Sequence, residues 1–370
     1  MSGLVSDSVE DILVRLDGED LIRCKSVCKS WLSLISSSCF VKTQLDYNKN
    51  KDHNNHELGH RRIIMPSRYG TPNDNWYING PWHIIGSSNG LVCVSPEDAQ
   101  VLVTNPLTRE VKKLQPDPQF SDDVVINRDL LCWGFGHDSS TDDYKVVAGI
   151  KVHKVGTLFH VLSLKSNIWE PISLVKYKFI AGDSRFGILW NGALHWFMKD
   201  YNTKKMVILS FDLSREEFNE CPQPDDSRYV FDDSTRLGIF NKCLCIFGDD
   251  DDDPPYQRWV MKNYNDKDSW EPLPYECEMN KNDVTHTLEC CTPHGVWCFC
   301  DDKRICLPKT RDYTGAPIFV KSIVSPHVDQ KPKKKRKPNI DIKSLEALFD
   351  YDDNSRLFCW QRRTKIFMVR

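Results

Sequence analysis

Short strand-like segments recur along most of this chain at a spacing near 50 residues. Six segments each begin with a turn residue and continue into apolar positions: Asn89–Val94, Asp143–Ala148, Asn191–Trp196, Asn241–Ile246, His294–Phe299 and Asn354–Cys359. Their starts are separated by 54, 48, 50, 53 and 60 residues. A period of this length is typical of the four-stranded blades of a β-propeller. We therefore expect roughly six blades between residues 63 and 370, with a β-sandwich as the alternative.

A second pattern has twice that period. Asn167-Ile-Trp169-Glu-Pro171 recurs as Asp268-Ser-Trp270-Glu-Pro272, 101 residues further along the chain. The pattern predicts a strand that ends in tryptophan and is followed by a turn at the proline.

The first forty residues follow a different period, that of an α-helix. Val9, Ile12, Leu13 and Leu16 share one helical face, with Ser6 or Asp7 as the expected N-cap. Asp17-Gly18 ends this helix, and the acidic pair Glu19-Asp20 opens a second one. Its apolar face is formed by Leu21, Cys24, Val27, Cys28, Trp31, Leu34 and Ile35. Some forty residues cannot bury all of this surface internally, so the remaining face needs the rest of the chain or another protein.

The N-terminal stretch resembles the F-box, the helical motif that docks on the Skp-type adaptor of cullin-based ubiquitin ligases. The matching segments are Leu4, Val9–Leu16, Leu21–Trp31, Leu34–Ser37 and Phe40. The resemblance implies that adaptor contacts come from Leu4, Val9, Ile12, Leu13, Leu16, Leu21, Val27 and Trp31. Val5 and Asp17 stand where the family usually has proline, which leaves the strength of docking open.

The later segments are similar to the plant F-box-associated domain, a kelch-like propeller that recognises substrates. They occur in the family's order between residues 86 and 273: Gly86–Val94, Thr104–Arg109, Gly134–Val147, Val161–Trp169, Asn191–Trp196, Leu209–Leu213 and Arg258–Lys262. The expected fold is mainly β with an N-terminal α-helical module. We place the F-box module at 1–41, a polar linker at 42–62 and the F-box-associated β-propeller domain at 63–370.

Composition excludes several classes of partner. The 49 Lys and Arg nearly balance the 52 Asp and Glu, so the net charge of -3 favours neither nucleic acid nor an anionic membrane. No apolar run reaches the eighteen or so residues of a membrane helix. The 15 cysteines are odd in number and no export signal precedes them, so we expect reduced thiols.

A basic run between prolines matches the nuclear-import pattern, with Lys333, Lys334, Lys335, Arg336 and Lys337 as the candidate residues. A solvated loop inserted in the last blade is the alternative interpretation. We therefore expect the protein in the nucleus and the cytoplasm.

Catalytic and metal-binding patterns are weak. The Cys and His residues between His286 and Cys306 lack a C-x-x-C pair, and the Asp pairs and the Asp249–Asp253 run fit solvated turns. We expect no catalytic residue, no metal and no cofactor. The exposed aromatic loops at Tyr69–Trp82, Asp249–Tyr256 and Thr310–Tyr313 are candidates for substrate contact, and packing of these aromatic side chains at the blade ends is the favoured alternative.

The function predicted from these features is that of a substrate-recognition adaptor in a Skp–cullin–F-box ubiquitin ligase. The helices would bind the Skp-type adaptor, and through it a cullin, while the β domain would hold an unknown protein substrate. The protein itself would not be an enzyme. One alternative is a stand-alone propeller interaction module with a degenerate F-box. Another is a propeller enzyme or carbohydrate binder.

Overall fold

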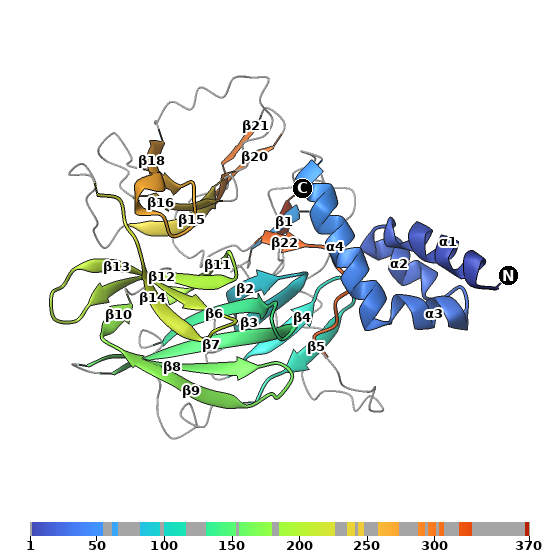
Figure 1. Cartoon of the computed structure of the whole chain (residues 1–370), viewed down its shortest axis with the longest axis horizontal. Coiled ribbons are helices and arrows are strands. Elements are labelled where there is room, and N and C mark those ends of the chain that lie inside the picture. The colour runs from blue at the N-terminus through green and yellow to red at the C-terminus, as the bar shows by residue number, and fades with distance from the viewer. Residues whose placement is uncertain are drawn as a thin grey trace, which may run out of the picture.

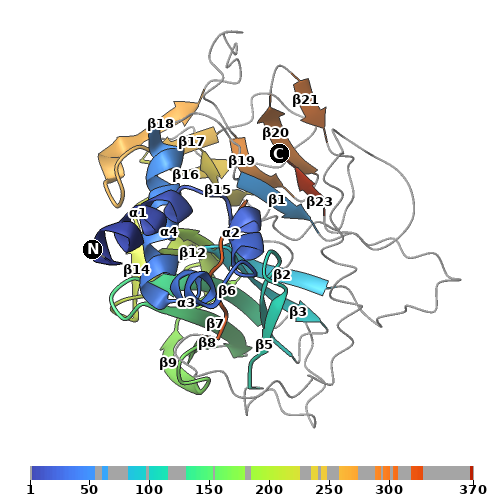
Figure 2. The same ribbon diagram turned by 90° about the vertical axis from the view of Figure 1, so that its right-hand side faces the viewer.

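The computed structural model describes residues 2–54, 61–65, 82–96, 100–115, 131–152, 155–179, 185–225, 235–240, 243–247, 258–273, 288–292, 295–300, 303–306, 318–327 and 367–369. Four helices gather at one end of the molecule, and antiparallel β-sheets make up the described remainder (Figures 1 and 2). This arrangement confirms a mainly β fold with an N-terminal helical module.

The helices are α1 (Ser2–Val14), α2 (Gly18–Cys24), α3 (Lys29–Ile35) and α4 (Ser38–Asn54). The chain turns between α1 and α2 because Asp17 is the N-cap of α2 and its carboxylate accepts from the Asp20 amide at 2.9 Å. The single second helix expected from the apolar spacing is interrupted. Cys28 adopts an extended N-cap conformation and separates α2 from α3. The first helix also begins earlier than Ser6 or Asp7, at Ser2.

The segment predicted as a polar linker, 42–62, is helical through Asn54 as part of α4. The prediction was wrong because it rested on the number of polar residues and not on where the buried residues lie along the helix. Gln44, Leu45 and Asn48 are buried, and Val41 and Tyr47 pack against hydrophobic cores. One side of α4 therefore gains enough contact to order residues that look like a linker in sequence.

Successive strands form antiparallel sheets (Figure 1). The first contains β2 (Trp82–Ser88), β3 (Leu91–Pro96), β4 (Leu102–Asn105) and β5 (Glu110–Lys113). The second contains β6 (Leu131–Asp138), β7 (Asp143–Val152), β8 (Gly156–Ser163) and β9 (Trp169–Val175). In the third, β10 (Tyr177–Phe179) and β11 (Ile188–Trp190) both pair with β12 (Ala193–Asp200), followed by β13 (Met206–Asp212) and β14 (Glu217–Cys221).

The next two groups of strands are joined. β15 (Arg236–Phe240), β16 (Cys243–Phe247), β17 (Arg258–Met261) and β18 (Trp270–Leu273) form one group, and a 3₁₀ turn at Lys267–Ser269 precedes β18. β19 (Leu288–Thr292), β20 (Gly295–Cys300) and β21 (Lys303–Cys306) form the other group. Pairing between β15 and β19 merges the two into a single seven-stranded sheet.

A further sheet links the beginning and the end of the β domain. β1 (Arg61–Met65) pairs with β22 (Ile318–Val320) on one side and with β23 (Phe367–Val369) on the other. Chain-distant strands thus cover each other's edges, which is how a propeller avoids long open edges.

The 50-residue period predicts one inner strand in each of five successive groups. The starts at 89, 143, 191, 241 and 294 immediately precede or open β3, β7, β12, β16 and β20. The two Asn-Gly turns within the described residues have positive φ, 51° and 82° at Asn89-Gly90 and 48° and 76° at Asn191-Gly192, as a tight hairpin requires. The sixth predicted start, at 354, lies outside the described residues.

The prediction that each of these strands ends at its tryptophan is wrong. Trp169 and Trp270 begin β9 and β18, and the prolines lie inside these outermost strands. An edge strand tolerates proline because its outward N–H has no strand partner. Each indole donates to the adjoining sheet, Trp169 to Gln115 O and Trp270 to Pro222 O, both at 2.9 Å. The repeated tryptophan therefore ties one sheet to the preceding one.

Candidate functional site

The helical module presents large apolar side chains to solvent. The exposed fractions are 62% for Ile12 on α1, 63% for Val27 after α2 and 46% for Leu32 on α3. Large apolar side chains that remain exposed on a small helical module are candidates for contact with another protein, and we call these three residues the exposed face. Two of these three residues, Ile12 and Val27, belong to the predicted adaptor-binding set.

Other members of that set are buried or partly buried in the core of the helical module. Leu13 and Leu21 are 1% and 0% exposed, in a core with Val14, Ile35, Phe40 and Ile323. Val9, Leu16 and Trp31 are partly buried against the same core. Leu4 lies on α1, and its side chain is outside the described part of the structure. In the free chain, Leu13 and Leu21 thus hold the helices together beneath the exposed face.

Two exposed residues of the module, Leu32 and Cys28, were not in the predicted set. Leu32 follows Cys28 by four residues, and this helical spacing was the signal that could have identified it. Cys28 is exposed, and hydrogen bonds with the Ser30 hydroxyl and from the Trp31 amide lower the pKa of its thiol. Both residues lie close in sequence to Val27.

The helices rest directly on the β domain. Gly18 at the start of α2 lies against Leu107 and Ile323, and a Cβ placed on it would come within 2.4 Å of Leu107 Cδ2. Lys321 forms an ion pair with Glu19 of α2. On the other side of the module, Lys42 of α4 lies 3.4 Å from Asp142 at the β6–β7 turn. These contacts orient the exposed face relative to the sheets.

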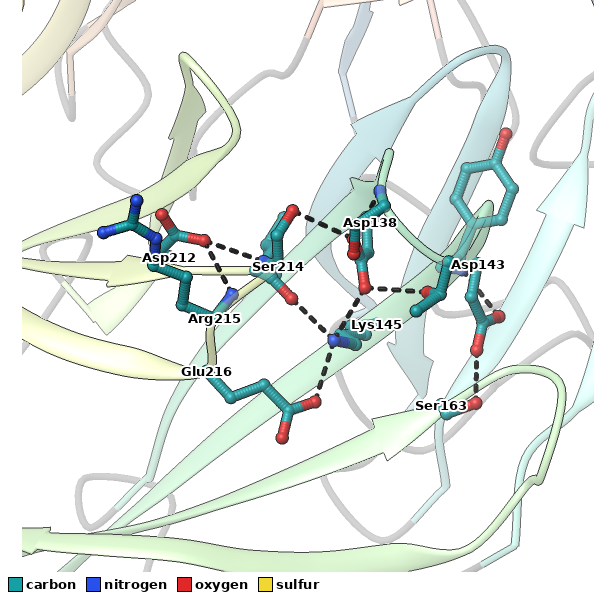
Figure 3. Close-up of polar contacts among 12 residues, drawn as sticks. Asp138, Asp143, Lys145, Ser163, Asp212, Ser214, Arg215 and Glu216 are labelled. Carbon is teal, nitrogen blue, oxygen red and sulfur yellow. Dashed lines mark hydrogen bonds and ion pairs between the residues drawn. The ribbon is translucent and has the colours of Figure 1, made fainter.

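A cluster of charged residues around the buried Lys145 and Asp138 lies between the second and third sheets (Figure 3). Lys145 Nζ lies 2.9 Å from Asp138 Oδ2 and 2.8 Å from Glu216 Oε1, and it donates to Leu213 O at 2.6 Å. The Asp138 carboxylate also accepts from Ser140 and Thr141, and from Ser214 of the neighbouring sheet.

Burial alone would raise the pKa of Asp138, but the bonds from Lys145, Ser140 and Thr141 outweigh it and hold the pKa of that carboxyl well below its usual range. Burial would lower the pKa of Lys145, and Glu216 and Asp138 outweigh that effect and raise it. Both groups therefore keep their charges at neutral pH. Because their bonding capacity is used in joining two sheets, the cluster is a structural tie and no proton donor or acceptor for catalysis.

The cysteines in the described part of the chain include both buried and exposed thiols. The described cysteines with resolved surroundings are free, and Cys93, Cys132, Cys221 and Cys245 are buried. Burial raises the pKa of Cys221 to about 12, so this thiol stays protonated. Within the described residues, no group of three or more His, Cys, Asp or Glu side chains is placed to hold a metal ion. The side chains of the cluster between His286 and Cys306 lie outside that description.

Several other predicted sites also lie outside the described residues. These are the import candidates Lys333, Lys334, Lys335, Arg336 and Lys337, and the loops Asp249–Tyr256 and Thr310–Tyr313. The loop Tyr69–Trp82 reaches the description only at the first residue of β2. These assignments remain predictions. Among the described helices, none has the length and apolarity needed to cross a membrane.

Comparison with known proteins gives the same two-part division. A model of the F-box domain matches residues 1–43, and a model of the F-box associated beta propeller domain matches residues 70–319. The F-box protein CPR1 of Arabidopsis thaliana is 28% identical over 305 residues, covering 73% of this chain and 72% of its own length. An F-box/kelch-repeat protein of the same plant is 30% identical over 296 residues, covering 72% and 78%. The chain belongs to the plant F-box proteins that carry a C-terminal F-box associated β-propeller domain.

Proposed function

We propose that this protein is the substrate-recognition adaptor of a Skp–cullin–F-box ubiquitin ligase. The observation that carries the proposal is the exposed apolar face on a module that matches the F-box domain. Ile12, Val27 and Leu32 would insert into an apolar groove of the Skp-type adaptor, where burying the exposed part of each side chain is favourable by roughly 1–2 kcal/mol.

The substitution at Asp17 is compatible with this docking. A proline in that place would preset the turn between the first two helices. Asp17 supports the same turn differently, by capping α2 through the Asp20 amide. The two helices therefore keep a defined relation without the family's proline, which favours a working F-box over a degenerate one.

The contribution of the chain to ubiquitin transfer would be proximity. A substrate held on the β domain while the helices bind the adaptor is kept near the charged ubiquitin carrier, which raises the effective concentration of its lysines. This role needs no catalytic group in the chain itself.

The alternative of a stand-alone interaction module makes a different prediction about the helices. In that case the exposed face would have no adaptor to bind, and the β domain alone would carry the function. The alternative of a propeller enzyme would need convergent titratable groups in a pocket. The buried charges of the second and third sheets are instead bonded to one another.

Co-purification tests the proposal. The full chain, immobilised through a C-terminal tag, is mixed with a purified Skp-type adaptor and its cullin, beside an established F-box protein as positive control. The proposal predicts that both proteins are retained. Retention by the control but not by this chain would leave the stand-alone module as the better account.

A further inference from the structure

The segment that follows the closing strand β22 runs directly beneath the docking helices. We call Lys321–Val324 the clamp segment. Val320, the last residue of β22, pairs with Arg61 of β1, so the clamp segment is continuous with the pairing that links the two ends of the β domain. Figures 1 and 2 show this orange-red segment passing between the helices and the first sheet.

One side of the clamp segment is fixed to the first sheet. Asn105, which is fully buried at the β4–β5 turn, donates through Nδ2 to Ser322 O at 2.9 Å and to Val324 O at 2.7 Å. The Ser322 hydroxyl donates to Asn89 O at 2.5 Å. Val324 packs in the core shared by the first two sheets. These contacts hold the segment against the first sheet.

The other side of the clamp segment is fixed to the helices. Ile323 is 3% exposed and completes the core of the helical module, together with Leu13 and Leu21. Lys321 pairs with Glu19 of α2. Helices as short as α2 and α3, with seven residues each, are not stable alone in water and depend on such packing.

We propose that closure of the β domain and order in the docking helices are thermodynamically coupled through the clamp segment. When β22 is paired with β1, Ile323 packs in the helical core and the helices that carry the exposed face are ordered. When β22 is unpaired, the core loses Ile323 and the short helices loosen. By reciprocity, a protein that binds and orders the helices also stabilises closure. A molecule of this protein whose β domain is open would then bind a protein partner of the helices poorly.

A single substitution separates the two functions of Asn105. Its Oδ1 caps the β4–β5 turn by accepting from Leu107 and Thr108, while its Nδ2 holds the clamp segment. Asp212 occupies the corresponding place at the β13–β14 turn, where its Oδ1 accepts from Ser214 and Arg215. Asn105→Asp therefore keeps the turn cap but sets a carboxylate against two carbonyl oxygens. Asp212→Asn is the matched control, the opposite exchange in an equivalent turn away from the clamp segment.

Hydrogen exchange of the full-length protein measures the coupling without any partner. Asn105→Asp should speed exchange in residues 318–324 and in α2 and α3 by about tenfold or more, because a buried pair of hydrogen bonds is lost. Exchange in β12 and β13 should stay as in the native chain, and Asp212→Asn should leave the helices unchanged. Faster exchange in 318–324 with native exchange in α2 and α3 would overturn the proposal.

Adaptor binding supplies a second readout, which rests on the proposed function. Affinity for a purified Skp-type adaptor should fall about tenfold in Asn105→Asp and stay native in Asp212→Asn. If the native chain binds no adaptor, the proposed function fails while the exchange result still decides the coupling. If Asn105→Asp does not fold, Ile323→Val, which removes one methyl group from the helical core, replaces it in both measurements with the same criteria.

Discussion

Ile323 and Val324 are consecutive residues whose side chains lie in two different cores. Ile323 packs with Leu13 and Leu21 in the helical module, and Val324 packs with Leu45 and Leu91 against the first sheet. Neighbouring side chains of an extended segment point in opposite directions, so two residues suffice to join the layers. This short piece of chain therefore joins the docking module to the β domain, in addition to the direct contacts that α4 makes through Leu45 and Lys42.

The first prediction concerns that junction. Ile323→Ala should lower the free energy of unfolding by about 2–5 kcal/mol, because it removes buried methyl groups and leaves a cavity. Ile168→Ala is the matched control, since Ile168 is 59% exposed and its truncation should change stability by no more than about 0.5 kcal/mol. Urea unfolding measures both. Equal effects would mean that Ile323 does not support the native fold.

The second prediction compares two glycines with the same backbone conformation. Gly90 and Gly192 have φ of 82° and 76°. A Cβ on Gly90 would lie 2.2 Å from Ser322 Oγ and 2.8 Å from Val320 O, whereas one on Gly192 meets nothing within 4 Å. Gly192→Ala should cost about 1–2 kcal/mol of backbone strain. Gly90→Ala should cost about 1–3 kcal/mol more because it also displaces the clamp segment.

Thermal or urea unfolding of the two glycine variants gives this difference directly. Equal destabilisation would show that the close approach of Ser322 to the β2–β3 turn has no energetic weight.

The third prediction concerns the charge cluster of Figure 3. Lys145→Met should destabilise the protein by about 3–5 kcal/mol, because it leaves the Asp138 carboxylate buried without its cation. The control is Lys176→Met. Lys176 lies 3.0 Å from Asp200, but its side chain is 55% exposed, so its loss should leave the unfolding midpoint close to that of the native chain. A native-like unfolding midpoint for Lys145→Met would contradict the structural role of the cluster.

The fourth prediction is a loss of stability in acid. Hydrogen bonds from the Thr203 amide and from Lys176 lower the pKa of Asp200 to about 2, and the pKa of Asp138 is also lowered. A carboxyl group with a depressed folded-state pKa stabilises the fold above its unfolded pKa of about 4 and loses that contribution as pH falls. Unfolding free energy should therefore decline between about pH 4 and pH 2.

Asp200→Asn removes one of these titrations. Its stability should decline less steeply with acid than that of the native chain over the same range. Parallel curves for the two proteins would show that Asp200 does not contribute to the acid transition.

Local sequence patterns predicted the strands but not what joins them. The Asn-Gly turns at Asn89 and Asn191 predict their hairpins because positive φ is a local requirement. The clamp segment could not be predicted in this way, since Asn105 reaches residues more than 200 positions away. The burial of Leu13 and Leu21 could not be predicted either, because it depends on how the helices pack against one another and against Ile323. Helical spacing identifies an apolar face but not which of its residues pack inward.

The affinity of the full-length chain for a purified Skp-type adaptor tests the central claim most directly. Ile12→Asp places a charge on the exposed face without disturbing the core, and Leu174→Asp does the same on β9, where Leu174 is 51% exposed. The account predicts tight binding by the native chain and by Leu174→Asp, and binding weaker by about tenfold or more in Ile12→Asp. Equal affinity of Ile12→Asp and the native chain would contradict it.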